Sequence, residues 1–480
     1  MTNTEAVNGS MASIIRQLVA EDLAAPGATD LVGDDRREFA RQRIFAHLDT
    51  LVGPDGNWSA FDNPETEQRM AQEVLDALFG LGRLQGLVDD PEIENIDING
   101  CDRVWVTYSD GSKVLMAPVA HSDDELVEMM RTAGSRFGLS ERRFDLARPE
   151  LDLQLPGGSR LSALMAVTAR PAVSIRRHRY SDLSLDDLVV LGSVDRPLAS
   201  LLAAAVRARK NIVVAGAMNS GKTTLLRALA AEVPPRERIV TIEQAFELGL
   251  DRMPARHPDM VALEARSANV EGQGLISVAD LVRRALRMNA DRVIVGEVLG
   301  DEVLPMLNAM SQGRSGSMCT IHADSSAGVF RRIASYAVQA PERLPLEAAN
   351  LLVAGAIHFV VYLDTAAHDP TEGDATDQIL RDDDDSLWPG RDDGLSLGTE
   401  VEEEGSLDIS FPPRSARTRF VSSVREVIDA EGVQVISNEV YRPGKDRRAV
   451  PASPLRAETR DELVRFGYQP IRAEWLGAPA

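Results

Sequence analysis

A glycine-bounded loop that ends in a lysine is the stretch best able to do chemistry. It follows the apolar run 211–215 and leads into a helical pattern over 224–230. Glycines at both ends let backbone N–H groups surround a phosphate, and the N-terminus of the following helix adds its dipole. Lysine supplies positive charge there, and a threonine hydroxyl can hold Mg²⁺. We therefore predict a binding site for a nucleoside triphosphate and Mg²⁺, formed by Gly216, Ala217, Met218, Asn219, Ser220, Gly221, Lys222, Thr223 and Thr224.

Two acids follow apolar runs further along the chain. Arg238–Ile242 reads as a strand ending at Glu243, and 292–295 as a second strand ending at Glu297. Ligands of parallel sheets bind at the carboxyl ends of the strands, so both carboxylates should face phosphates held by Lys222. One carboxylate can orient the attacking water, and the other can bind water on Mg²⁺. We predict Lys222, Glu243 and Glu297 as catalytic residues, with Thr223 and Glu297 at the metal.

The stretch 313–322 reads as a third strand, and its end carries His322. A neutral imidazole can hydrogen-bond an oxygen of the γ-phosphate and respond to its loss, and we add His322 to the catalytic set. The alternative is a histidine that only satisfies a structural hydrogen bond. Cys319 beside it is interpreted as a small buried side chain.

The whole composition restricts the class of protein. The 480 residues carry a net charge of −22, which argues against a nucleic-acid partner. No run approaches the length of about 18 apolar residues that spans a bilayer, and no export signal is apparent, so we expect a cytoplasmic protein. Two cysteines are too few for a disulfide scaffold or a four-cysteine zinc site. We expect no zinc.

Helical and strand-like patterns predict two α/β domains. Alternating runs between residues 93 and 176, with turns at 109–112 and around Pro156, indicate a first, smaller domain. From Pro197 helices and strands alternate, which predicts a mainly parallel sheet covered by helices. The expected order is a polar N-terminus with lead-in helices (1–69), the α/β N-terminal domain (70–180), a linker (181–196) that runs into a helix at Leu188, and the main domain (197–364).

An acidic segment interrupts the second domain. Residues 365–412 hold fifteen Asp or Glu and two Arg, more than half of the net charge. We expect this segment to be disordered. The alternating runs that follow predict a hairpin (413–450) that completes the sheet of the main domain, before a tail (451–480).

The order of the glycine loop, Glu243, Glu297 and the His322 strand resembles that of secretion ATPases, specifically the CpaF/TadA type that powers Tad/Flp pilus assembly. The similar stretches include RIVTIE, MNADRVIVGE, GSMCTIHADSS and SNEVYRPG. The resemblance implies a RecA-like P-loop NTPase domain behind an α/β N-terminal domain, a homohexameric ring, ATP as substrate and Mg²⁺ as cofactor. It also implies an inner-membrane platform protein as partner, reached from the cytoplasm.

The same resemblance assigns three arginines of the N-terminal domain to the nucleotide: Arg160, Arg176 and Arg177. Guanidinium groups pair with phosphate oxygens and keep their charge, although a solvated basic strand end is the alternative interpretation. The chain departs from the family at Gln244, Leu299 and Arg314, where relatives usually carry an acid, an arginine and a histidine. These departures predict slow hydrolysis.

Two other functions remain open. One is a type IV secretion ATPase that moves protein or DNA, and the other is a nucleotide-sensing scaffold with little turnover. The chain lacks the two Cys-x-x-Cys pairs found in many pilus-extension and type II ATPases, which argues against that branch. The sequence does not identify the transported substrate or the direction of work.

Overall fold

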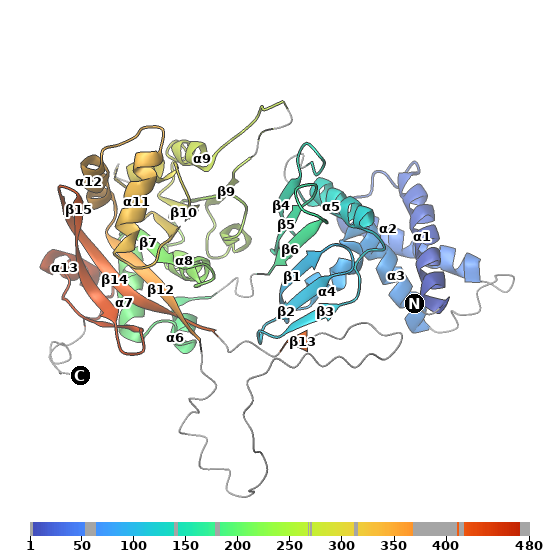
Figure 1. Ribbon diagram of the computed structural model, residues 1–480, viewed down its shortest axis with the longest axis horizontal. Coiled ribbons are helices and arrows are strands. Elements are labelled where there is room, and N and C mark those ends of the chain that lie inside the picture. The colour runs from blue at the N-terminus through green and yellow to red at the C-terminus, as the bar shows by residue number, and fades with distance from the viewer. Residues whose placement is uncertain are drawn as a thin grey trace, which may run out of the picture. The chain divides into compact units, whose positions relative to one another are not determined.

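The computed structural model describes residues 3–52, 64–138, 143–177, 183–266, 268, 271–311, 315–367, 410–411 and 417–470. The chain forms two compact units, each described here by itself. The first holds residues 1–109 and 113–178, and the second holds 110–112 and 179–480. Figure 1 shows their helices and strands.

Three helices begin the first unit: α1 (Asn3–Ala24), α2 (Gly33–Val52) and α3 (Pro64–Phe79). Helix α1 lies in the stretch predicted as a polar N-terminus. Its apolar residues Met11, Ile15, Val19 and Leu23 recur every four residues and are buried against α2 and α3. One apolar stripe is enough for a helix that packs in a bundle, which composition alone did not reveal. The expected boundary at 69/70 falls inside α3.

An antiparallel sheet follows in the first unit, with short helices before it and a longer helix against it. Its strands run in the order β3 (Lys113–Met116), β2 (Val104–Tyr108), β1 (Ile93–Asn99), β6 (Ala172–Arg176), β5 (Arg160–Leu164) and β4 (Glu150–Gln154). The predicted turn at 109–112 joins β2 to β3. Helix α5 (Asp123–Phe137), capped by Ser122, buries Leu126 and Met130 in the cluster that covers one face of the sheet. The short helices η2 (Gly82–Leu84) and α4 (Gln85–Asp89) precede β1.

The second unit is built on a mixed sheet in the order β16-β15-β14-β12-β7-β11-β10-β8-β9. The strands from β12 to β9 pair in parallel, whereas β14, β15 and β16 pair antiparallel at the other side. The bounds are β7 (Ile212–Gly216), β8 (Ile239–Glu243), β9 (Met260–Glu264), β10 (Arg292–Val298), β11 (Met318–His322), β12 (Phe359–Ala367), β14 (Arg417–Glu431), β15 (Gln434–Pro443) and β16 (Ala449–Pro451). The α/β class predicted from the sequence is therefore confirmed, with a sheet that is mixed.

Helices cover both faces of this sheet (Figure 1). Side chains of β7 alternate between two cores: Ile212 and Val214 pack with α6, α7, α8 and α13, while Val213 and Ala215 pack with α9 to α12. Burial on both faces explains why these strands read as continuous apolar runs. The helices are α6 (Leu185–Val190), α7 (Arg196–Arg207), α8 (Lys222–Ala230), α9 (Val278–Ala285), α10 (Val303–Ser311), α11 (Gly328–Gln339), α12 (Leu346–Ala356) and α13 (Ala457–Arg465), with the short η3 (Leu250–Arg252).

Two segments differ from the expected order. Helix α6 begins at Leu185, three residues before the expected helix start, because Ser184 and Asp187 form a capping box. The segment expected as a tail begins at the last residue of β16 and contains α13, which an ion pair between Glu462 and Lys210 connects to the residue before Asn211. The short strand β13 (Ser410–Phe411) lies between β12 and β14 in the chain.

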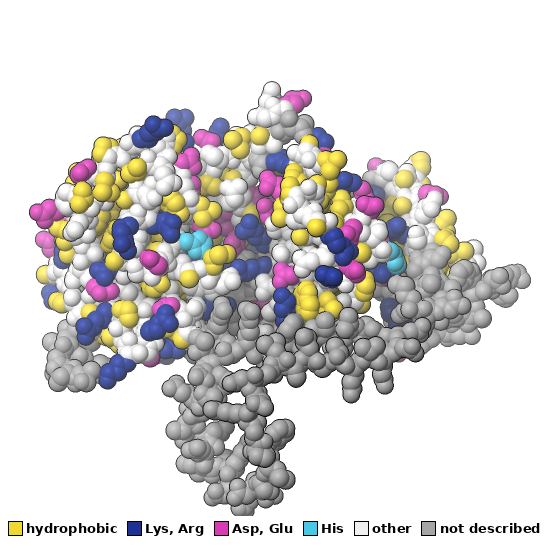
Figure 2. All heavy atoms as spheres, viewed as in Figure 1, with side chains coloured by type: hydrophobic (Ala, Val, Ile, Leu, Met, Phe, Trp, Pro, Cys, Tyr) yellow, Lys and Arg dark blue, Asp and Glu magenta, His cyan; other side chains and the backbone are white. Residues whose placement is uncertain are grey.

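The acidic segment predicted to be disordered lies outside the described residues from 368 to 409. On the face drawn in Figure 2, the described part of the second unit carries basic and acidic side chains interspersed. Within the described ranges, no helix is long and apolar enough to cross a membrane.

Candidate active site

Strand register brings the predicted site residues to one edge of the sheet. His322, the last residue of β11, pairs directly with Gly216, the last residue of β7. Strand β10 lies next to β11 and carries Glu297, and β8 lies next to β10 and ends at Glu243. Because these strands are parallel, all four of their carboxyl ends lie at the same edge.

The glycine loop has the backbone that a phosphate cradle needs. Asn219 and Gly221 adopt positive φ angles of 61° and 93°. Such left-handed residues turn successive N–H groups toward one concave side, where an anion can bind. Helix α8 starts at Lys222 immediately afterwards, so its N-terminal N–H groups and its dipole act on the same point.

Lys222, His322 and Glu297 form a continuous chain of polar contacts. The Lys222 Nζ lies 2.9 Å from the carbonyl oxygen of Ala217 and 3.1 Å from Nδ1 of His322. The other ring nitrogen, Nε2, lies 2.6 Å from Oε1 of Glu297. An ammonium can only donate, so Nδ1 accepts, and Nε2 then carries the proton that is donated to Glu297. The lysine, the imidazole and one acid are thus already coupled to one another.

An irregularity in β10 orients Glu297. Val295 pairs with Cys319 and Val298 pairs with Ile321, so β10 contains one more residue than β11 between these two pairs. An extra residue of this kind bends a strand and changes the direction of its side chains. Glu297 lies within this bulge, together with Gly296.

Glu243 differs from Glu297 in its surroundings. Its side chain is only 4% exposed, and its Oε1 accepts hydrogen bonds from the backbone N–H groups of Glu247 and Leu248, at 2.9 and 2.8 Å. Burial raises the pKa of Glu243 to about 7, and the two N–H donors partly oppose that shift. A carboxyl group with this pKa can both hold and release a proton near neutral pH.

Sequence reasoning missed Glu247, which contacts the predicted metal ligand. The hydroxyl of Thr223 donates to Oε1 of Glu247 at 3.0 Å. Gln244, one of the three departures from the family pattern named above, is exposed. The structure therefore places a carboxylate at Thr223 despite the glutamine. The pattern of an acid four residues after Glu243 was the available signal.

Sequence reasoning also missed Arg419, on β14. Its Nε donates to the carbonyl oxygen of Asn219 in the glycine loop at 2.9 Å. The two residues lie 200 positions apart, and no local pattern marks this arginine. Only the pairing of β14 with β12, which places Arg419 opposite Thr365, brings it to the loop.

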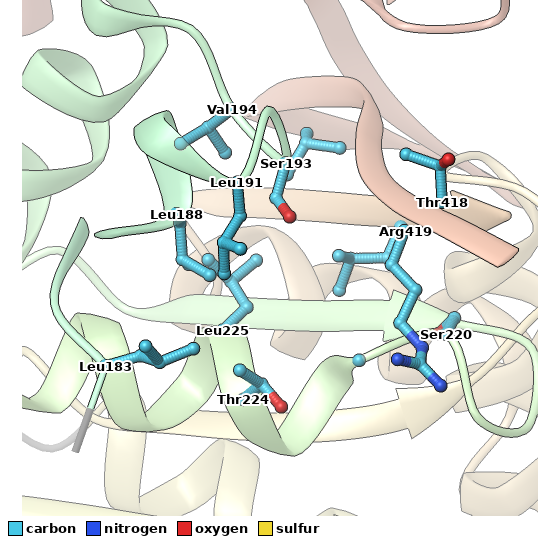
Figure 3. Close-up of a pocket in the computed structure, with 13 residues that line it drawn as sticks. Leu183, Leu188, Leu191, Ser193, Val194, Ser220, Thr224, Leu225, Thr418 and Arg419 are labelled. Atoms are coloured by element: carbon cyan, nitrogen blue, oxygen red, sulfur yellow. The ribbon is translucent and has the colours of Figure 1, made fainter. Parts of the chain in front are cut away.

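A small pocket adjoins the glycine loop in the second unit. It has a volume of about 190 Å³, and Figure 3 shows its walls. Gly221, Thr224 and Ser220 line it together with Arg419, whose side chain extends toward Ser220. Most of the remaining wall is apolar: Leu183, Leu188, Leu191, Val194, Leu225, Leu363 and Val421.

The three predicted arginines belong to the first unit. Arg160 and Arg176 are directly opposite each other on β5 and β6. Arg160 has only a loose ion pair with Asp152, at 3.8 Å, and Arg176 is exposed. The guanidinium of Arg177 donates to the backbone oxygen of Asp90. Like charges directly opposite each other do not stabilise a sheet.

The other two departures from the family pattern are Leu299 and Arg314. Leu299 is 53% exposed, and Arg314 lies outside the described residues. No group of three or more His, Cys, Asp and Glu that could hold a metal ion occurs among the described residues.

Two relatives each match more than half of this chain. A "Putative conjugal transfer protein" of Mycobacterium tuberculosis is 38% identical over 265 residues, which are 53% of this chain and 72% of that protein. The type IV secretion system protein PtlH of Bordetella pertussis is 33% identical over 318 residues, 60% of this chain and 90% of PtlH.

Among solved structures, the VirB11 ATPase from the Brucella suis type IV secretion system, in complex with sulphate, is similar with a TM-score of 0.32 and 28% identity. The match covers 63% of this chain and 94% of that one. The model of the family described as Type II/IV secretion system protein matches residues 81–382, more than half of the chain. The chain therefore belongs to the type II/IV secretion system protein family.

Proposed function

We propose that this protein hydrolyses ATP and that the energy drives a secretion machine. The observation that carries the proposal is the convergence of a phosphate-binding loop, a histidine and two acids at one edge of the sheet. In detail, Lys222 contacts His322, His322 contacts Glu297, and Glu243 ends the strand next to that of Glu297. Fold alone would not justify this function, but these residue types at this edge do.

The second unit would hold the substrate as follows. Backbone N–H groups of the glycine loop and α8 would surround the phosphates, and Lys222 would leave its present acceptors to bind the terminal ones. Thr223, whose hydroxyl contacts Glu247, would bind Mg²⁺ together with Glu297, because this cation prefers oxygen ligands. When bound, Mg²⁺ neutralises charge on the phosphates.

Glu243 and His322 would carry the proton chemistry. A buried acid with a pKa near 7 is suited to orient the attacking water and accept its proton. Glu297 fixes the tautomer and the orientation of the His322 ring, whose Nδ1 would be released to the γ-phosphate once Lys222 moves.

The pocket beside Gly221 and Thr224 would receive the base of the nucleotide. It opens next to the N-terminus of α8 and is lined mainly by leucine and valine (Figure 3). Apolar walls with a few polar groups are typical of small-molecule sites. We also propose that Arg160, Arg176 and Arg177 contact the bound nucleotide, by analogy with the family.

The specific machine is a finer proposal. The similar stretches named above favour a CpaF-type, RecA-like motor that assembles as a homohexamer. It would work on an inner-membrane platform protein of a Tad/Flp pilus system, from the cytoplasmic side. We also keep the predicted domain order for this motor, with a linker at 181–196, an acidic segment at 365–412 and a hairpin at 413–450.

A type IV secretion motor is the second candidate, because PtlH and a further relative, VirB11, are named as proteins of such systems. Deleting the gene in its source organism discriminates the two. Loss of surface pili with unchanged protein and DNA export supports the pilus motor, and the reverse result supports the second candidate.

Phosphate release by the purified protein tests the enzymatic proposal. Lys222→Ala should reduce the rate at saturating Mg·ATP at least about 100-fold, because the lysine charge stabilises the transferred phosphoryl group. Lys445→Ala, at an exposed turn in the same unit, is the matched control and should keep the wild-type rate. Equal rates for Lys222→Ala and wild type would refute hydrolysis at this site. Tight ATP binding without release by wild type would instead identify a sensing scaffold.

A further inference from the structure

Arg419, on strand β14 of the C-terminal hairpin, lies against the glycine loop. Its stem packs on Gly221: a Cβ added to that glycine would lie 3.4 Å from Cδ of Arg419. Its Nε holds the carbonyl oxygen of Asn219. The arginine therefore lies over the turn from the loop into α8, as Figure 3 shows.

The terminal nitrogens of Arg419 are candidates for contact with a ligand. Neither terminal nitrogen has a hydrogen bond or an ion pair among the described residues, although the chain carries many more acids than bases. In the same pocket, Ser220 is fully buried and its Oγ has no hydrogen-bond partner within the described part of the chain. Buried polar atoms without partners are rare, so each needs an explanation.

The position of Arg419 indicates which part of a nucleotide it would meet. In glycine loops of this type, the lysine reaches the β- and γ-phosphates, while the backbone at the start of the helix holds the α- and β-phosphates. Lys222 points toward His322, on β11. Arg419 instead lines the pocket formed by Gly221, Thr224 and Leu225, on the side of β12 and β14.

We propose that Arg419 binds the α-phosphate of the nucleotide through its two terminal nitrogens, while its Nε fixes the glycine loop. This inference rests on the proposed function, because it needs a nucleotide in the site. A planar guanidinium can make both contacts at once, since its nitrogens point in different directions. The α-phosphate is common to ATP and ADP, so the contact would persist through the hydrolytic cycle.

A purely structural role, in which only the bond to Asn219 matters, is the alternative. Arg419→Gln separates the two roles, because the glutamine amide nitrogen follows Cδ as Nε does and can still donate to Asn219. The substitution removes the terminal nitrogens and the charge. Arg419→Lys makes the reverse change, since it keeps a charge but has no donor at the position of Nε.

Calorimetric titration of the full chain with Mg·ADP and Mg·AMP-PNP tests the proposal. Arg419→Gln should weaken the binding of both by about tenfold, to a similar extent, with an unchanged melting temperature in the absence of nucleotide. Arg419→Lys should bind both more tightly than Arg419→Gln. Lys445→Ala is the control for loss of a positive charge elsewhere in the unit.

Two results would overturn the inference. One is wild-type affinity of Arg419→Gln for both nucleotides, which would leave Arg419 only its bond to Asn219. The other is weakened binding of Mg·AMP-PNP alone, which would place the contact at the γ-phosphate. If wild-type protein bound neither nucleotide, the proposed function itself would fail, and that outcome is distinct from both.

Discussion

At the scale of single residues, two opposing effects act on the pKa of the Glu243 carboxyl group. Burial favours its neutral form, and two backbone N–H groups favour its charged form. Burial prevails, and the pKa rises from 4.5 to about 7. The folded chain therefore keeps an acid that is costly to ionise where a catalytic base is proposed.

This conflict predicts a pH-dependent gain of stability in Glu243→Gln. In the unfolded chain the glutamate ionises near 4.5, while in the folded chain it ionises near 7. Between these values the unfolded state has lost a proton that the folded state keeps, so wild-type stability falls as pH rises through this window. Glutamine keeps the acceptor for both N–H groups and never ionises.

We expect Glu243→Gln to melt at a higher temperature than wild type at pH 8, with a stabilisation of up to about 3 kcal/mol, and to show almost no difference at pH 4.5. Thermal melting at both values measures this, with Glu347→Gln, on the exposed side of α12, as control. A constant difference at the two pH values would show that the Glu243 carboxyl group is not perturbed by burial.

Residue types and spacing were sufficient to predict that Lys222, Glu243, Glu297 and His322 would meet at one edge. Parallel strands align their carboxyl ends whatever the intervening loops do. Residue types and spacing did not predict the individual side-chain contacts. The bonds of Glu247 to Thr223 and of Arg419 to Asn219 depend on the course of the chain after β8 and on the pairing of β14. The acid four residues after Glu243 is a local signal for Glu247 but does not identify its partner, and no local pattern marks Arg419.

At the scale of elements, the amide of Asn211 holds the opposite edge of the second sheet together. This fully buried residue precedes β7. Its Oδ1 accepts from the N–H groups of Gly316 and Ser317, at 2.8 and 3.0 Å, and its Nδ2 donates to the carbonyl oxygens of Met310 and Ala356. The amide thus connects the ends of α10 and α12 to the segment that leads into β11, the strand that carries His322.

Asn211→Ala should therefore destabilise the protein strongly. It would leave two N–H groups and two carbonyl oxygens buried without partners, and each such group costs about 1–3 kcal/mol. We expect a loss of roughly 3 kcal/mol or more, measured by thermal or urea unfolding. Asn308→Ala, at an exposed position of α10, is the control and should change stability by less than about 0.5 kcal/mol. Similar small losses for both variants would contradict the role of the Asn211 amide.

The elements themselves were predicted unevenly. The strands of the second sheet were visible because burial on both faces produces runs such as Ile212–Ala215. Helices α1 and α13 were not predicted: the buried residues of α1 form one stripe among polar side chains, and α13 buries only Thr459 and Leu463 within the described residues. Tertiary packing, rather than local composition, stabilises such helices.

At the scale of the whole molecule, the proposed motor needs both units. Arg160 and Arg176 lie side by side on the first unit, where they do not stabilise the sheet. If they contact the nucleotide, the double variant Arg160→Ala, Arg176→Ala should lower ATP turnover at least about tenfold while the melting temperature stays within about 2 °C of wild type.

Steady-state turnover and melting curves check this prediction, with the exposed Arg69 of α3 replaced by alanine as the control in the same unit. Unchanged turnover would show that the two arginines are a solvated basic strand end. Sizing with and without Mg·ATP tests the proposed hexamer in the same preparations, because a ring motor should assemble when nucleotide is bound.

The central claim is that side chains at the carboxyl ends of the second sheet's strands, Glu243 above all, hydrolyse the triphosphate bound by the glycine loop. Phosphate release by Glu243→Gln, measured at a Mg·ATP concentration at which binding is saturated, tests it most directly. The predicted result is binding within about threefold of wild type and turnover lowered at least about 100-fold. Wild-type turnover by this variant would contradict the claim, because the proposed base would then be dispensable.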